Sequence, residues 1–238
     1  MIELHYWTTP NGHKITMMLE ELGVPYDIKV VRINRGDQFK PEFLHIAPNN
    51  RIPAIVDHAP ADGGAPLSVF ESGAILQYLA EKYEAFIPSD LRGRYECMQW
   101  LFWQMAGLGP MAGQNHHFVQ FASEKIPYAI ERYVKETSRL YGVLNKHLSD
   151  GRLFICGNAY TIADMACYPW IVPHERQQQN LNDFPALKAW FERIAARPAT
   201  VKAYDIAKAI NTAPTVDEEA KKHLYGQDAQ TVQQPPKA

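Results

Sequence analysis

Asn49-Asn-Arg-Ile-Pro-Ala-Ile-Val-Asp57 and, after a glycine-rich turn, Leu67-Ser-Val-Phe-Glu-Ser-Gly-Ala-Ile75 are the stretches that decide the fold. Pro53 opens the apolar run from Ala54 to Val56. Because proline cannot donate to a sheet ladder, it belongs at the first residue of a strand or at a sheet edge. The backbone of Ile52 is therefore free to pair with a group outside the protein, and we expect the Ile52–Pro53 peptide bond to be cis.

The second stretch joins a strand to the start of a helix. Residues 67–70 are predicted to form a short strand, and helical spacing of apolar residues begins after Ser72. We expect Ser72 to be the N-cap of that helix, which places free N–H groups and a positive dipole end beside the Glu71 carboxylate. Exposed strand backbone, a carboxylate and an anion-attracting helix start together suit a small zwitterionic peptide.

The first third of the chain has the pattern of an α/β domain. Alternating apolar residues predict a strand over 2–6, and apolar residues at i, i+3, i+4 and i+7 predict a helix that ends near Leu22, before Gly23 and Pro25. A second strand is expected over 28–33 and a short helix over 41–47. The resulting order, β-α-β-α-β-β-α, indicates an α/β domain over residues 1–84.

The remainder of the chain has a helical pattern. A Thr161–Asp164 capping box precedes one apolar segment, and Gly107, Gly109, Pro110 and Gly113 are expected to end the first helix. We expect an all-helical domain over 91–210 and a polar, flexible tail over 211–238 with one short helix at 217–224. The other helices are predicted at 91–108, 128–148, 185–196 and 199–210.

Composition excludes several classes of function. A net charge of −2 leaves no basic footprint for nucleic acid or for an anionic membrane surface. No apolar run approaches the roughly 20 residues of a membrane-spanning helix. The first residues enter a predicted strand directly, with no leader-like segment, so we expect a cytoplasmic protein.

Cysteine and histidine usage argues against a metal centre and against a disulfide framework. The three cysteines, Cys97, Cys156 and Cys167, have no CxxC spacing and lie in apolar surroundings, so we expect buried, inert thiols. Any redox chemistry then needs a thiol brought from outside. The adjacent His116 and His117 are expected to lie in a loop as structural or pocket-lining residues, because no spaced third ligand accompanies them.

Several runs of residues carry a resemblance that covers roughly residues 1–210. The chain resembles the cytosolic glutathione transferases, whose N-terminal domain is thioredoxin-like, and is most similar to the bacterial nu-class proteins, which are glutathione-dependent disulfide-bond oxidoreductases. Pro53 with Glu71-Ser72 indicates the superfamily, and the runs around Asn11 and His116 select the subgroup. The carrying stretches are 9–14, 36–39, 49–57, 70–73, 99–103, 109–117 and 127–132.

The resemblance implies a site that binds glutathione, in its reduced or disulfide form, as a co-substrate. It implies that the Ile52 backbone, before Pro53, pairs with the cysteinyl unit, and that Glu71 and Ser72 hold the γ-glutamyl end. Thr9 takes the position of the residue that hydrogen-bonds the sulfur. The further glutathione contacts that the resemblance implies are Asn11, which also assists the sulfur, with Gln38, Arg51 and, from the helical domain, Arg132.

The expected reaction is thiol–disulfide exchange with bound glutathione, without a protein cysteine as nucleophile. A conventional conjugating transferase or a glutathione-dependent peroxidase is the alternative within the enzymes, and Tyr6 then competes with Thr9 for the sulfur. A glutathione-transferase-fold interaction module is the non-enzyme alternative. The resemblance also implies a homodimer that acts on small disulfides or electrophiles.

Overall fold

The computed structural model describes residues 1–212 and 216–233, and its chain forms two compact units. Unit 1 comprises Met1–Lys82 together with the chain from Lys202 onward, and unit 2 comprises Tyr83–Val201. The C-terminal segment therefore groups with the N-terminal unit, whereas the sequence suggests a helical domain that extends to residue 210.

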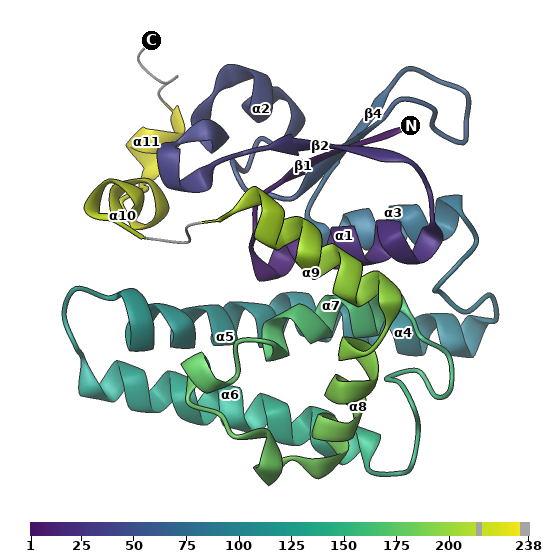
Figure 1. The fold of residues 1–238 in the computed structure, drawn as a ribbon, viewed down its shortest axis with the longest axis vertical. Coiled ribbons are helices and arrows are strands. Elements are labelled where there is room, and N and C mark those ends of the chain that lie inside the picture. Colours follow the sequence, from purple (N-terminus) through teal and green to yellow (C-terminus); the bar gives the residue numbers. More distant parts are fainter. Residues whose placement is uncertain (213–215, 234–238) are drawn as a thin grey trace. The chain divides into compact units, whose positions relative to one another are not determined.

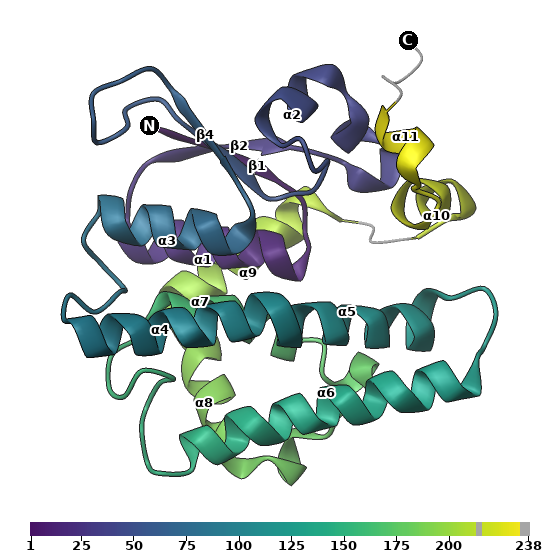
Figure 2. The same ribbon diagram turned by 180° about the vertical axis from the view of Figure 1, so that it is seen from behind.

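Unit 1 is built on a mixed four-stranded sheet with the order β2-β1-β3-β4. Strand β1 (Ile2–Tyr6) pairs in parallel with β2 (Tyr26–Val30), and the antiparallel partners β3 (Ala54–Asp57) and β4 (Leu67–Phe70) continue the sheet. Helices α1 (Pro10–Leu22) and α3 (Ser72–Lys82) cover one face, and α2 (Pro41–Ile46) lies on the other (Figures 1 and 2). The predicted thioredoxin-like fold is confirmed.

Local sequence explains most boundaries in this unit. Ile2, Leu4 and Tyr6 of β1 are fully buried, whereas the alternate residues are half-buried, as period-2 alternation requires. Helix α1 begins at the Thr9 cap and ends at Gly23, which has a positive φ of 63° that glycine adopts without a Cβ penalty. The extent of β1 and the end of α1 agree with the predicted ones.

The second strand differs from its prediction. It spans Tyr26–Val30, not 28–33. The Val31 N–H still donates to the Tyr6 carbonyl at 2.9 Å, but the side chains of Val31 and Ile33 join the apolar cluster that contains Phe43 of α2. Residues Ile33–Arg35 then form a 3₁₀ turn, followed by a second over Asp37–Phe39. Apolar residues that leave a sheet to cover a helix keep the same sequence pattern as a strand, so periodicity alone misplaced this boundary.

The stretch around Pro53 has the predicted backbone. The Ile52–Pro53 peptide bond is cis, and β3 begins at the next residue, Ala54. The prediction that Ser72 is the N-cap is off by one residue, because Glu71 adopts a positive φ of 71° and its carbonyl accepts the first helical bond from Ile75, at 2.9 Å. Ser72 is thus the first residue of α3 itself.

Unit 2 is helical, as predicted, but its first helix does not end at the glycines. Helix α4 (Leu91–Trp103) continues through a π-helical turn (Gln104–Leu108) into α5 (Gly109–His116) and a second π turn (His117–Phe121). The wider π turn accommodates Pro110, which has no N–H to donate. A Cβ on Gly113 would lie 3.3 Å from Trp170, so this glycine permits close helix packing and does not terminate the helix.

The remaining helices of unit 2 are α6 (Pro127–Leu148), α7 (Ile162–Ile171) and α8 (Pro185–Ala195). The predicted capping box at the start of α7 is confirmed: Asp164 accepts from the Thr161 N–H at 2.9 Å. Asp164 also accepts from the Trp190 indole at 2.8 Å, and its burial raises its pKa to about 6. This carboxyl ties α7 to α8 inside the core.

The described part of the C-terminal chain, up to residue 233, contains the helices α9 (Pro198–Ile210), α10 (Glu218–Tyr225) and α11 (Ala229–Gln233). The short helix predicted at 217–224 is confirmed, with Asp217 as its cap. Arg35 donates to Asp217 at 3.0 Å and pairs with Glu219, which holds α10 against the 33–39 turns. The rest of the expected flexible tail includes 213–215 and 234–238, which lie outside the described residues.

Among the described residues, no helix has the length and apolarity needed to cross a bilayer.

Candidate functional site

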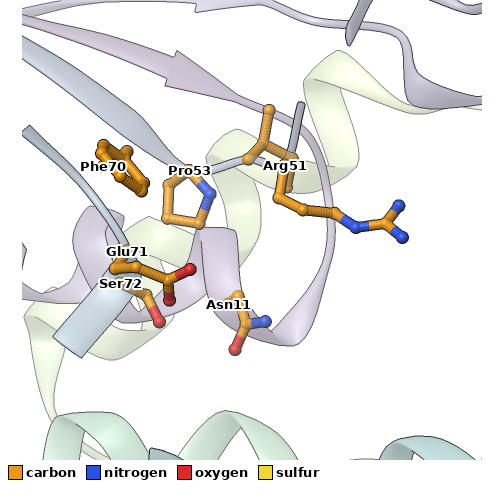
Figure 3. Close-up of a pocket in the computed structure, with 7 residues that line it drawn as sticks. Asn11, Arg51, Pro53, Phe70, Glu71 and Ser72 are labelled. Atoms are coloured by element: carbon orange, nitrogen blue, oxygen red, sulfur yellow. The ribbon is translucent and has the colours of Figure 1, made fainter. Parts of the chain in front are cut away.

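A pocket of about 240 Å³ opens in unit 1 where three separate stretches of the sequence meet. Figure 3 shows the side-chain oxygens of Glu71 and Ser72 on the same side as Asn11, with the Arg51 guanidinium extending away from them. Pockets that enclose drug-sized ligands have volumes of roughly 300–1,000 Å³, so this one encloses only part of a tripeptide. Its lining residues are Asn11, Arg51, Ile52, Pro53, Phe70, Glu71 and Ser72.

The acidic wall of the pocket is the junction between β4 and α3. Glu71 lies there with its φ in the left-handed region, and the Asn49 amide approaches its carboxylate at 3.4 Å. A non-glycine residue in this region costs free energy and is found preferentially at functional sites. The conformation places an exposed carboxylate directly before the buried Ser72, so a negative group and a hydroxyl open into the same pocket.

The start of α1 supplies a second part of the pocket wall, through Asn11. Thr9 caps the helix by accepting the Gly12 N–H at 3.2 Å, which leaves the hydroxyl proton to be donated to another acceptor. A Cβ on Gly12 would lie 2.3 Å from the Trp7 carbonyl oxygen, so only glycine lets this turn pack against the end of β1. Asn11 lines the pocket, whereas Thr9 is half-buried and is not among its lining residues.

Gln38 and Arg132, two of the predicted ligand contacts, lie outside this pocket. Gln38 is 1% exposed, and its amide donates to the Ile33 carbonyl at 3.0 Å and to the His223 carbonyl at 3.5 Å. Arg132 is an exposed residue of α6 in unit 2. Their roles in ligand binding stay predictions.

Tyr6, the alternative to Thr9, is a core residue. It is fully buried, and its hydroxyl lies 3.0 Å from Nδ1 of His13, at the back of α1. Burial raises the pKa of Tyr6 above its usual range and lowers the pKa of His13 to about 4. A protonated tyrosine bonded to an uncharged imidazole in the core fits a structural role better than that of a group that stabilises a sulfur anion.

The histidine pair belongs to a helix and not to the expected loop. His116 ends α5 and stacks on Phe121 with ring centroids 5.2 Å apart, and its burial lowers its pKa to about 4. His117 begins the following π turn. The uninterrupted helix through Pro110 explains the difference. No cluster of three or more potential metal-binding side chains occurs within residues 1–212 and 216–233.

Comparison with known proteins identifies the family. The model of the glutathione S-transferase N-terminal domain matches residues 8–82, and that of the C-terminal domain matches residues 113–198. The disulfide-bond oxidoreductase YfcG of Escherichia coli is 58% identical over 203 residues, which cover 85% of this chain and 94% of that protein. The chain belongs to the glutathione S-transferase family. The predicted resemblance is thereby confirmed.

Solved structures of glutathione transferases agree with this assignment. A glutathione transferase family member from Pseudomonas fluorescens with two glutathione molecules bound is 44% identical, with a TM-score of 0.80 over 85% of this chain and 91% of that one. A glutathione transferase from Pseudomonas putida, solved with one glutathione disulfide bound per subunit, is 40% identical, with a TM-score of 0.82 over 86% and 91% of the two chains.

Sequence reasoning missed two residues of this site. Phe70 lines the pocket at the end of β4, although the sequence had assigned it no role in the site beyond its place in the 70–73 stretch. Lys14 is fully buried beneath Ser72, with its ammonium 3.1 Å from the Ser72 hydroxyl. A signal existed for Lys14: it precedes Met18 by four residues, so it lies on the apolar face of α1.

Proposed function

We propose that this chain is a glutathione-dependent disulfide-bond reductase. The observation that carries the proposal is the pocket, which joins the predicted site residues Asn11, Arg51, Ile52-Pro53 and Glu71-Ser72 in one unit. The 58% identity to a protein named a disulfide-bond oxidoreductase supports the reaction class. The glutathione-bound structures of related proteins support the co-substrate.

Glutathione binds with its γ-glutamyl end in this pocket. The Glu71 carboxylate receives the ammonium, and the Ser72 hydroxyl with the first N–H groups of α3 receives the carboxylate. The backbone of Ile52, before Pro53, pairs with the cysteinyl unit, and Asn11 and Arg51 contact the peptide. Because the pocket encloses only part of a tripeptide, the sulfur stays accessible to a second substrate.

The chemistry is thiol–disulfide exchange. The thiolate of bound glutathione attacks one sulfur of a disulfide, forms a mixed disulfide with it and expels the other sulfur as a thiolate. A second glutathione then attacks the mixed disulfide, which yields glutathione disulfide and a second thiol. The Thr9 hydroxyl and the Asn11 amide, at the start of α1, donate to the attacking sulfur and favour its thiolate form.

No protein thiol takes part in this exchange. All three cysteines of the chain lie in unit 2, and unit 1, which contains the pocket, has none. Cys97 and Cys167 are fully buried, as predicted, whereas Cys156 is half-buried. The protein contributes alignment and thiolate stabilisation.

Two further proposals concern the setting of the enzyme. It works in the cytoplasm, where the glutathione pool is kept reduced and can supply two electrons per turnover. It assembles as a homodimer, as the resemblance implies, and a molar mass near twice 27.1 kDa in light scattering tests this. A mass of one chain contradicts the dimer without affecting the proposed chemistry.

Activity assays separate the proposed reaction from its alternatives. Reduction of a small dialkyl disulfide by glutathione is measured beside conjugation of glutathione to an aromatic halide and reduction of a hydroperoxide. Dominant disulfide turnover supports the reductase. Dominant conjugation or peroxide reduction refutes it in favour of the other enzymes, and no activity without glutathione binding favours an interaction module.

A further inference from the structure

A lysine is buried directly beneath the pocket. Lys14 of α1 has no exposed surface and is among the largest fully buried side chains of the described chain. Lysine is almost never fully buried in proteins unless it is paired, because its ammonium loses its hydration. Nζ of Lys14 lies 3.1 Å from Oγ of Ser72, which is 3% exposed and lines the pocket.

Lys14 is the donor of this hydrogen bond and the Ser72 hydroxyl oxygen is its acceptor. An ammonium has three protons and no lone pair, so Lys14 donates and the Ser72 oxygen accepts. The hydroxyl proton of Ser72 must therefore be donated to a different acceptor. Because the neighbouring cation draws electron density from the oxygen, it also makes this hydroxyl a stronger donor.

Negative and positive charge lie at different places around the pocket. The Glu71 carboxylate lies on the exposed side, and the Lys14 ammonium lies behind Ser72. The Arg51 guanidinium extends away from Glu71 and Ser72 in Figure 3. An α-amino acid group presents an ammonium and a carboxylate on one carbon. Its ammonium matches Glu71, and its carboxylate then meets Ser72 with a positive charge behind it.

We propose that Lys14 is a positioning residue for the ligand carboxylate: its ammonium holds the Ser72 hydroxyl in place by donating to its oxygen and supplies positive charge behind this carboxylate. The inference rests on the proposed binding of glutathione and adds a residue that does not itself line the pocket. The competing explanation is that the Lys14–Ser72 hydrogen bond only holds α1 against α3. In that case, replacing Lys14 should weaken the binding of every ligand by the same factor.

Calorimetric titration of three ligands separates the two explanations. The ligands are glutathione, an analogue that lacks the γ-glutamyl α-carboxylate and an analogue that lacks the α-ammonium. In Lys14→Met, the affinity for glutathione should fall about tenfold to hundredfold, the loss expected for a hydrogen bond to a charged group. The affinity for the analogue without the carboxylate should change by less than about threefold, because it has no group for Lys14 to act on.

A matched control uses another lysine of unit 1. Lys202 pairs with Glu20 of α1 at 2.7 Å, and its side chain is mostly exposed. Lys202→Met removes the same charge from a site away from the pocket, so all three affinities should stay at their wild-type values. In Lys14→Met, the penalty for removing the ligand ammonium should also remain, since Glu71 is intact.

Equal weakening of all three ligands in a folded Lys14→Met variant would overturn the proposal, as would an unchanged affinity for glutathione. If the wild-type protein does not bind glutathione, the proposed function itself fails. If the variant does not fold, ¹⁵N spectra of the wild-type lysine ammonium groups decide. The Lys14 signal should move with glutathione but not with the analogue that lacks the carboxylate, and equal movement overturns the proposal.

Discussion

Replacing Glu71 by glycine and by alanine separates its two roles, in binding and in backbone strain. Both variants remove the carboxylate from the pocket, but only glycine relieves the positive φ of 71°. A non-glycine residue in the left-handed region costs about 1–2 kcal/mol. Glycine loses about 0.5–1 kcal/mol more conformational entropy on folding. The strain relief is the larger effect, so Glu71→Gly should be more stable than Glu71→Ala by about 0.5–1 kcal/mol.

Scanning calorimetry without ligand measures this difference. For a chain of this size, 1 kcal/mol corresponds to roughly 2–4 °C in Tm, so Glu71→Gly should melt about 1–4 °C above Glu71→Ala. Both variants should bind glutathione about tenfold or more weakly than the wild-type chain, since each lacks the partner of the ligand ammonium. The glutamate at position 71 would then strengthen glutathione binding while its backbone conformation lowers the stability of the fold.

Two results would refute the reasoning. If Glu71→Gly melts no higher than Glu71→Ala, the left-handed backbone conformation at residue 71 does not destabilise the folded protein. If either variant keeps the wild-type affinity for glutathione, the carboxylate does not hold the ammonium and the ligand is placed incorrectly. Comparing glycine with alanine at one position keeps all other contributions to the melting temperature the same.

Two further predictions concern the thiolate and acid stability. Thr9→Ala should shift the rise of kcat/KM to higher pH, because the thiolate of bound glutathione loses a hydrogen-bond donor. Thr9→Ser keeps the hydroxyl and should retain the wild-type pH profile. An unshifted profile in Thr9→Ala would exclude Thr9 as a donor to the sulfur. Burial lowers the pKa of His13 from 6.5 to about 4, so the unfolded chain binds this proton more tightly. Stability is then fully present above pH 6.5 and should fall by roughly 2–3 kcal/mol as the pH drops toward 4. Denaturant unfolding of His13→Asn over the same pH range should show a correspondingly smaller loss, and an identical loss would assign the effect to other groups.

The sequence was sufficient where local chemistry decides the structure. The alternation in 2–6, the Gly23 end of α1 and the Thr161–Asp164 capping box each depend on neighbours in the chain, and the structure has them as predicted. Pro53 marked both the start of β3 and the cis bond before it. The pocket-lining residues Arg51 and Ile52, directly before this proline, and Glu71-Ser72 were predictable from the family motif.

Contacts between distant parts of the chain account for what the sequence did not predict. The helix continues through Gly109 and Pro110 because a π turn precedes them and Trp170 packs closely against Gly113. Gln38 belongs to a stretch that carries the family resemblance, yet its amide donates to the carbonyls of Ile33 and His223. The packing of α10 against the 33–39 turns was not predicted, although its helix was. A buried lysine under Ser72 has no local signature beyond its position on the apolar face of α1.

The central claim is that bound glutathione, and not a protein thiol, reduces the disulfide. Its most direct test is disulfide turnover by a variant with Cys97→Ala, Cys156→Ser and Cys167→Ala, where alanine avoids an unpaired hydroxyl at the two fully buried positions. We predict a kcat/KM within about twofold of the wild-type value. A folded variant that loses about tenfold or more in kcat/KM, or a wild-type chain that carries glutathione covalently during turnover, would contradict the account.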